Sequence, residues 1–217
     1  MDDGRGPPEE RLARRLEARA VSRPSVVATM LHELAEADRA VYRAIASTPS
    51  PTLDAPLRRL SHLADHSKLW VGAAAALYAL GGRRGRKAAV TGLVALGINS
   101  ALVNLPMKLA SRRVRPDRDA AGVPETRWVP MPSSTSFPSG HSASAFAFAG
   151  AVAGALPALA APLRGVAAAV AYSRVHTGVH YPGDVVVGSL VGATIGEATA
   201  AAARVLGRRA GSTERDR

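Results

Sequence analysis

Eight residues in three clusters have types and spacings that suit chemistry. The first cluster holds a lysine and, seven positions later, an Arg-Pro pair. The second is the run Pro-Ser-Gly-His, and the third begins Ser-Arg and continues through a histidine to an aspartate. Each cluster stands at the end of an apolar run. The eight residues, in chain order, are Lys108, Arg115, Ser139, Gly140, His141, Arg174, His180 and Asp184.

Five of these residues suit the binding of a tetrahedral oxyanion. Lys108, Arg115 and Arg174 are cations, and the planar fork of arginine matches two phosphate oxygens at once. Ser139 offers a hydroxyl. Gly140 lets its backbone N–H approach closely, at a point where a helix is about to begin and free N–H groups favour anions. The set therefore indicates a phosphate-binding site.

The remaining three residues suit the making and breaking of bonds. His180 and Asp184 are four positions apart, so the carboxylate can accept the imidazole N–H, fix the tautomer and make the other ring nitrogen a better nucleophile. His141 can then donate a proton to a leaving alkoxide. Phosphoryl transfer to a histidine is the chemistry that this arrangement predicts.

The apolar runs predict how these residues are positioned. Five runs indicate membrane helices, and the first of them is short for a span. If each run crosses the membrane once, the ends near residues 108, 141, 174 and 184 lie at one face, and the three clusters meet there. The predicted spans are 67–81, 88–107, 141–157, 163–175 and 184–206.

Composition agrees with a membrane protein. The chain has 217 residues, 47% of them hydrophobic, and a net charge of +11. The basic residues flank the apolar runs, as at a membrane surface, and are not interleaved with aromatics as in nucleic-acid binding. There is no cysteine, which excludes disulfides and thiolate chemistry. The acidic, proline-containing start is unlike a cleavable signal peptide.

Four segments are expected. Residues 1–24 form a polar, disordered tail, and residues 25–66 form an amphipathic helix (25–47) lying on the membrane, followed by a connector broken by Pro49, Pro51 and Pro56. Residues 67–206 form the catalytic domain, and 207–217 a basic tail. The predicted fold is all-α, an integral-membrane helical bundle of about five spans.

The three clusters resemble the signatures KxxxxxxRP, PSGH and SRxxxxxHxxxD of the type 2 phosphatidic acid phosphatases, the PAP2 superfamily of membrane lipid phosphatases. The resemblance covers about residues 67–206. It implies that Lys108, Arg115 and Arg174, with Ser139 and Gly140, bind phosphate. It also implies that His141 is the general acid, that His180 attacks phosphorus and that Asp184 orients His180, without any metal or cofactor. The family has six spans, one more than this chain shows.

The resemblance implies a substrate that is a lipid phosphate in the bilayer, of the phosphatidic acid, phosphatidylglycerol phosphate, polyprenyl diphosphate or polyprenyl-linked sugar phosphate type. Positive charges in the 82–87 loop favour a plasma-membrane protein with its site facing outward. Two alternatives stay open: oxidation of the kind carried out by vanadium haloperoxidases, which share the motifs, and a non-enzymatic membrane protein that binds lipid phosphates.

Several other polar residues have a simpler interpretation. Arginines in the loop after residue 108 are expected to anchor helix ends at the membrane surface; they are Arg112, Arg113, Arg118 and Arg127. His176 is expected to be structural. His62 and His66, with Asp65, are expected to form a polar turn and not a metal site. Trp128 is either an interface anchor or a lid. The repeat Gly188, Gly192, Gly196 predicts close helix packing.

Overall fold

A computed structural model describes residue 7, residues 9–10 and residues 25–213. The predicted disorder of the 1–24 tail therefore falls almost wholly outside the described residues. The chain divides into two units, residues 1–40 and residues 41–217. Helix α2 (Val26–Ser47) begins in the first unit and ends in the second. The helix predicted over 25–47 is thus present, and its placement on a membrane surface stays a prediction.

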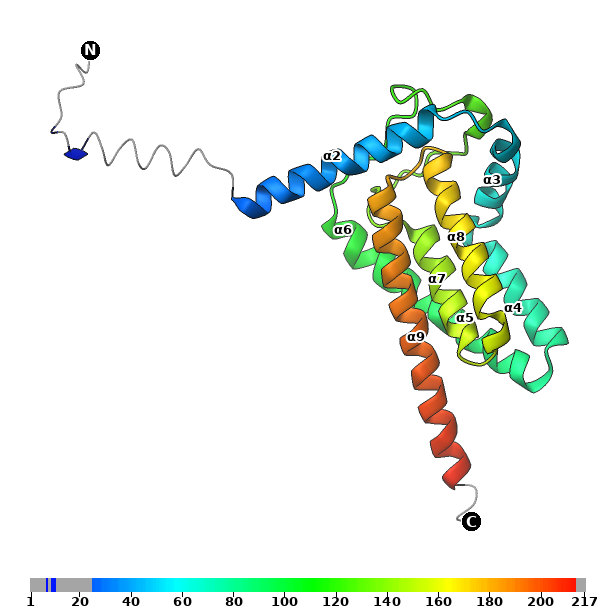
Figure 1. The fold of residues 1–217 in the computed structure, drawn as a ribbon. Coiled ribbons are helices and arrows are strands. Elements are labelled where there is room, and N and C mark those ends of the chain that lie inside the picture. Colours follow the sequence, from blue (N-terminus) through cyan, green and yellow to red (C-terminus); the bar gives the residue numbers. More distant parts are fainter. Residues whose placement is uncertain (1–6, 8, 11–24, 214–217) are drawn as a thin grey trace. The chain divides into compact units, whose positions relative to one another are not determined.

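The second unit is an all-helical bundle, and the described residues contain no strand (Figure 1). After α2 come α3 (Pro51–Leu63), the short turn η1 (Asp65–Ser67), α4 (Lys68–Leu80) and α5 (Gly82–Leu102). A π-helical turn η2 (Val103–Met107) around Pro106 joins α5 to α6 (Lys108–Ala110). A long loop containing η3 (Glu125–Arg127) leads to α7 (Gly140–Ala153), η4 (Pro157–Leu159), α8 (Ala160–His176) and α9 (Pro182–Thr213).

Helix α7 is the centre of the bundle. It packs against α5, α8 and α9, and most of its residues are buried, the majority of these being alanines. Its Phe148 ring lies 5.4 Å from the ring of Trp70 on α4. On α9, Gly188 faces the backbone of Ser139 at the start of α7, which confirms that this glycine serves close packing.

The connector differs from its prediction. Pro49 lies in the break between α2 and α3, as predicted, but Pro51 and Pro56 fall within helix α3 and do not break the chain. Pro51 is at the first helical position, where its missing N–H costs nothing. Pro56 removes one internal hydrogen bond, and packing of α3 against α8 compensates for it. The connector is therefore a structured part of the bundle.

The outer faces of the long helices are apolar. Two described helical stretches are long and apolar enough to cross a membrane, Gly82–Ala110 and Pro182–Arg209. Large exposed side chains occur along both of them, and soluble proteins rarely expose so many. They include Val90, Leu93, Val94, Ile98, Leu102, Val186, Leu190, Val205 and Leu206. Helices α4, α7 and α8 occur at the other three predicted spans, with α8 extending past its predicted range at both ends, but none of them is among the two candidate membrane helices, so the number of five spans stays a prediction.

Candidate active site

The predicted clusters meet at one end of the bundle. Helices α5 and α8 end there, α7 and α9 begin there, and the long loop after α6 lies across it (Figure 1). Direct hydrogen bonds join them: the backbone N–H of Ser139 donates to the carbonyl of Asp184 at 2.9 Å, and a side chain of the loop reaches His180. The expected convergence of distant segments is therefore present.

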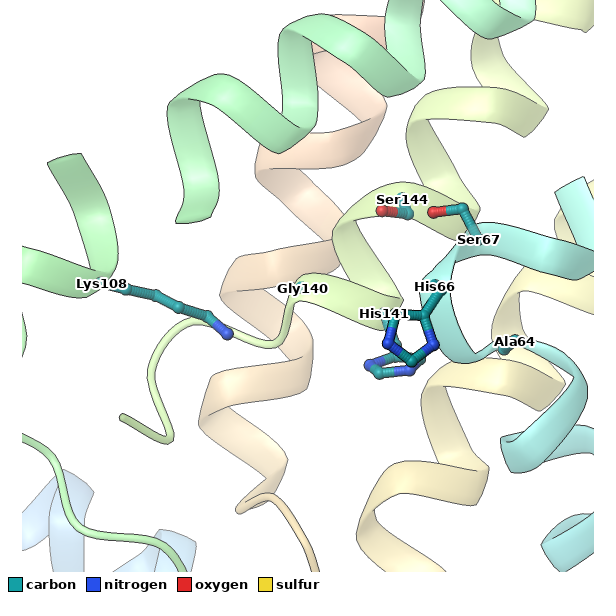
Figure 2. A pocket seen from close by; sticks show the side chains of 7 residues that line it. All are labelled: Ala64, His66, Ser67, Lys108, Gly140, His141 and Ser144. Carbon is teal, nitrogen blue, oxygen red and sulfur yellow. The ribbon is translucent and has the colours of Figure 1, made fainter. Parts of the chain in front are cut away.

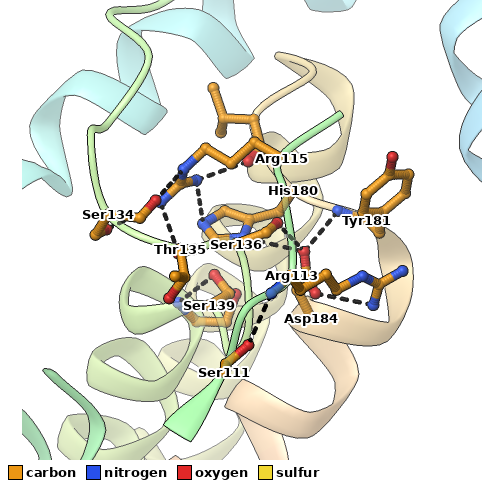
Figure 3. A network of polar contacts seen from close by, with 12 residues as sticks. Ser111, Arg113, Arg115, Ser134, Thr135, Ser136, Ser139, His180, Tyr181 and Asp184 are labelled. Carbon is orange, nitrogen blue, oxygen red and sulfur yellow. Dashed lines mark hydrogen bonds and ion pairs between the residues drawn. The ribbon is translucent and has the colours of Figure 1, made fainter. Parts of the chain in front are cut away.

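His180 and Asp184 form a buried pair. The distance from His180 Nδ1 to Asp184 Oδ2 is 3.3 Å. On the other side of the ring, Nη1 of Arg115 lies 3.1 Å from His180 Nε2 (Figure 3). A guanidinium can only donate, so Nε2 must be the acceptor and the ring proton is on Nδ1, facing the carboxylate. The imidazole is thus neutral, and its lone pair is on Nε2.

Electrostatics favour the same neutral form of His180. Burial lowers the pKa of His180 to about 3, and the charges of Arg115 and Arg174 act in the same direction. The hydrogen bond with Asp184 acts in the opposite direction but does not outweigh burial. An imidazole must be unprotonated to attack phosphorus, so the neutral state of His180 is compatible with its predicted role as nucleophile.

Asp184 is held by more donors than the sequence indicated. Its carboxylate is fully buried and accepts a short hydrogen bond from Ser136 and another from the Tyr181 N–H at 2.9 Å. Nη1 of Arg113 lies 3.0 Å from the other oxygen, and the Arg113 guanidinium stacks 4.4 Å from the Tyr181 ring. These contacts fix the carboxylate that orients His180 (Figure 3).

Arg115 is fixed by the loop that faces His180. Its Nε donates to the carbonyl of Ser134 at 2.9 Å, and its Nη1 donates to that of Val179 at 2.7 Å. Lys108 is tied to the same loop, since its ammonium donates to Ser134 Oγ at 2.9 Å. Two of the three cations predicted to bind phosphate are therefore held against one loop segment, and Arg115 also lies beside Nε2 of His180, the predicted nucleophile.

Arg174 reaches the site from the end of α8. It is 1% exposed, its Nη1 donates to Ser61 Oγ at 2.5 Å, and the same nitrogen lies 3.8 Å from Asp65. Its Nε has no hydrogen-bond partner among the described residues. A buried guanidinium with an unused donor can accept an anion at little further cost.

Ser139 and Gly140 form the start of α7. Ser139 Oγ caps the helix by accepting from Ser142 Oγ at 2.9 Å and from the Ser142 N–H at 3.4 Å. Gly140 is the first helical residue, and its N–H is one of those that a helix leaves unpaired. The serine thus shapes the helix start, and the backbone N–H groups there face the site.

His141 has a partner that the motifs did not reveal. Its Nε2 lies 2.9 Å from Oδ1 of Asp65, in the η1 turn before α4. The hydrogen bond to His141 is the main reason that the pKa of Asp65 lies below its usual value. Asp65 also lies 3.5 Å from His62, as expected for a polar turn, and the described residues contain no group of three His, Asp or Glu able to hold a metal.

Two of the predicted surface arginines have other roles. Arg113 binds Asp184, as described above. Arg127 is 1% exposed: its Nε donates to Asp54 at 2.8 Å, and its Nη2 donates to the Thr48 carbonyl at 2.7 Å. The anchor prediction is wrong for both, because each guanidinium meets a carboxylate that lies far away in the sequence. Arg127 instead fastens the loop to the connection between α2 and α3.

Three neighbouring residues complete this end of the bundle. His176 is buried and lies 3.0 Å from Asp54, which agrees with its predicted structural role. Trp128 donates its Nε1–H to the Val123 carbonyl at 3.0 Å, and Arg118 stacks 4.5 Å from its ring. Trp128 and Arg118 therefore stabilise the fold of the loop.

Comparison with known proteins gives a consistent result. The family model described as PAP2 superfamily matches residues 87–207, which include all three clusters. A decaprenylphosphoryl-5-phosphoribose phosphatase of Mycobacterium tuberculosis (strain ATCC 25618 / H37Rv) is 38% identical over 154 residues, covering 67% of this chain and 78% of the relative. The protein of the same name from Mycolicibacterium smegmatis is 36% identical over 156 residues, covering 69% and 77%.

Two solved structures are similar in fold. One is a transmembrane PAP2 type phosphatidylglycerolphosphate phosphatase from Bacillus subtilis, with a TM-score of 0.60, 25% identity, and coverage of 77% of this chain and 84% of that one. The other is LpxE from Aquifex aeolicus, with a TM-score of 0.57, 25% identity, and coverage of 73% and 92%.

Proposed function

The chain belongs to the PAP2 superfamily and is a phosphoric ester hydrolase, and we propose that it removes phosphate from a membrane lipid through a phosphohistidine intermediate without a metal. The observation that carries this proposal is the state of His180. Its Nδ1–H faces a fixed carboxylate, and its Nε2 lone pair faces Arg115, one of the cations that would hold a phosphate.

The reaction has two steps. His180 Nε2 forms a bond to phosphorus while the ester P–O bond breaks, and the leaving alkoxide takes a proton from His141. A water molecule then gives a proton to His141 and attacks phosphorus, which breaks the N–P bond and releases phosphate. Lys108, Arg115 and Arg174 stabilise the charge on the phosphoryl oxygens in both steps.

Asp65 supports the acid. A carboxylate that accepts a hydrogen bond from His141 Nε2 favours the protonated imidazole, which is the form that can release a proton. With Nε2 occupied in this way, Nδ1 is the nitrogen available to the leaving oxygen. Asp184 has a different task, since it holds the neutral ring of His180 through Nδ1–H, and the site thus contains two carboxylate–imidazole pairs with opposite tasks.

We infer the substrate class from the relatives. Two proteins that share more than a third of their residues with this chain over two thirds of its length are named decaprenylphosphoryl-5-phosphoribose phosphatases. A polyprenyl-linked sugar phosphate is therefore the substrate that we propose, ahead of phosphatidic acid, phosphatidylglycerol phosphate and polyprenyl diphosphate.

The intermediate gives the decisive experiment. The purified full chain is mixed with lipid substrate carrying ³²P in its phosphate and quenched within milliseconds. Wild type should carry label that is stable in alkali and lost in acid, as a phosphohistidine is. His180→Asn should carry no label and release no phosphate. Asp184→Asn should release phosphate at least about a hundredfold more slowly than wild type. Label on the protein or release of phosphate in His180→Asn would show that His180 is not the nucleophile.

We also propose that the protein lies in the plasma membrane with its site facing outward. Arg83, Arg84, Arg86 and Lys87 lie at the opposite end of the bundle from the site, where positive charge favours the cytoplasm. Cations at the site end count for less, because Arg113 and Arg127 are engaged by carboxylates.

Single cysteines test this orientation, since the chain has none of its own. Arg84→Cys and Glu125→Cys replace exposed residues at opposite ends of the bundle. An impermeant thiol reagent added to intact cells should label position 125 and spare position 84. The reverse pattern would place the site in the cytoplasm.

A further inference from the structure

A small polar pocket adjoins the proposed acid. Its volume is about 130 Å³, which is room for far more than one water molecule. His141 is in its wall, and every other lining side chain is short or polar (Figure 2). The lining residues are Ala64, His66, Ser67, Lys108, Gly140, His141 and Ser144.

Two of the lining residues are held in an unfavourable backbone conformation. His66 and Ser67 have φ values of 53° and 58°, in the left-handed region that residues with a Cβ rarely adopt. The kink between η1 and α4 that they form directs both residues to the pocket (Figure 2). Backbone strain of this kind is often kept where it positions groups for function.

The pocket has hydrogen-bonding capacity that the fold does not use. The side chains of His66 and Ser67 form no hydrogen bond with another described residue. Ser144 Oγ accepts from Asn99 Nδ2 at 3.1 Å and keeps its own proton free to donate. Figure 2 shows Ser67 and Ser144 close to one another in the wall of the pocket, with the Ser67 hydroxyl directed toward Ser144. These groups suit a ligand that carries several hydroxyls.

We propose that this pocket binds the leaving group, and that it selects leaving groups with hydroxyls next to the ester oxygen, such as a sugar or a glycerol. The inference rests on the proposed function: if His141 protonates the ester oxygen, the atoms that follow this oxygen must lie beside His141. Ser67, Ser144 and His66 would bond their hydroxyls. Ser67 and Ser144 are half-buried, so a leaving group without hydroxyls would displace their water without replacing its hydrogen bonds, which is costly.

A matched pair of substrates tests this selectivity. One is 1-acylglycerol 3-phosphate, and the other is its 2-deoxy analogue with the same acyl chain, so that they differ in one hydroxyl. We expect kcat/KM of the full chain to be about tenfold higher for the hydroxylated substrate. Ser67→Gly should lower this ratio by about two- to tenfold, which is the effect of one lost hydrogen bond.

The choice of glycine keeps the test independent of folding. Glycine adopts φ near 58° without strain, so Ser67→Gly removes the hydroxyl and relieves the backbone together. Ser67→Ala removes the same hydroxyl but keeps the strain, and it should lower the ratio equally. Ser47→Ala, at an exposed serine whose hydroxyl bonds within α2, is the matched control and should leave the ratio unchanged.

Inhibition by inorganic phosphate separates the role of Ser67 from that of Lys108 and Gly140, which line the same pocket and are assigned to phosphate binding. Its inhibition constant should be the same in wild type and Ser67→Gly, because Ser67 meets the leaving group and not the phosphate. A ratio of kcat/KM for the two substrates near one in wild type, or one that Ser67→Gly does not lower, would overturn the assignment of the pocket. Hydrolysis of both substrates would still support the proposed function. Absence of turnover on every lipid phosphate tested would overturn both.

Discussion

A methyl group at Gly188 should disable the enzyme without unfolding it. Gly188 lies on α9, one helical turn after Asp184, and faces the backbone of Ser139 at the start of α7. A Cβ placed on Gly188 would lie 2.5 Å from the Ser139 carbonyl oxygen, whereas ordinary contact begins at 3.4 Å, so α7 or α9 must move by about 0.9 Å.

The displacement falls directly on the site. Helix α7 carries Gly140 and His141, and α9 carries Asp184, so separating the helices separates the acid from the nucleophile that Asp184 orients. A misplacement of about 1 Å can cost a hundredfold in rate, and we expect kcat/KM of Gly188→Ala to fall by about that factor. Overpacking costs roughly 1–3 kcal/mol, and the better helix propensity of alanine offsets roughly 0.5–1 kcal/mol, so most molecules should stay folded.

The assay compares kcat/KM with the free energy of unfolding in detergent. Gly97→Ala is the control, because Gly97 is an exposed glycine of α5 with no atom near its missing Cβ. Gly97→Ala should keep its activity within about twofold and gain roughly 0.5–1 kcal/mol in stability. Full activity in Gly188→Ala would show that the approach of α7 to α9 does not set the geometry of the site.

Three further outcomes are expected. The pKa of His180 is lowered to about 3 in the folded protein and is about 6.5 in an unfolded chain, so the unfolded chain binds more protons between these two pH values. The free energy of unfolding should therefore fall as pH is lowered from about 6.5 to 3. This fall should be less steep in His180→Gln. Arg127→Met should cost about 3 kcal/mol in unfolding free energy, since it leaves the Asp54 carboxylate without its ion-pair partner, and Arg127→Met combined with Asp54→Leu should recover part of it. Activity should survive excess chelator. Orthovanadate should inhibit competitively, and this inhibition should be weaker in Arg174→Ala. Loss of activity with chelator and its return with magnesium would contradict the metal-free mechanism.

The main elements of the fold were predictable because they depend on local signals. Long apolar runs bounded by Gly, Pro and charged residues predicted where α4, α5, α7, α8 and α9 lie, although the helix ends differ by several residues. Helix α5 begins at Gly82, so the 82–87 stretch that was predicted to be a loop is helical. The convergence of Lys108, His141 and Asp184 followed from counting spans, since alternate ends of consecutive helices share a face. Helix α3 was not predicted, because closely spaced prolines usually interrupt a helix. In the structure Pro51 is the first helical residue, a position at which proline is tolerated.

The support around the site was not predictable, because it depends on pairs far apart in the chain. Asp65 and His141 are 76 residues apart, and Arg113 and Asp184 are 71 residues apart. A loop arginine that binds a buried carboxylate has the same sequence context as one that anchors a helix at the membrane surface. Only the packed structure distinguishes Arg113 and Arg127 from arginines that face solvent.

The position of Asp184 in the chain has a consequence for biosynthesis. This carboxylate gathers Ser136, Arg113 and His180, yet it is among the last of the site residues to leave the ribosome. Until α9 has entered the membrane and packed against α7, the donors that converge on Asp184 have no acceptor, and His180 has no group to set its tautomer. We therefore expect a nascent or truncated chain that lacks α9 to be inactive, so that hydrolysis of lipid begins only when the bundle is complete.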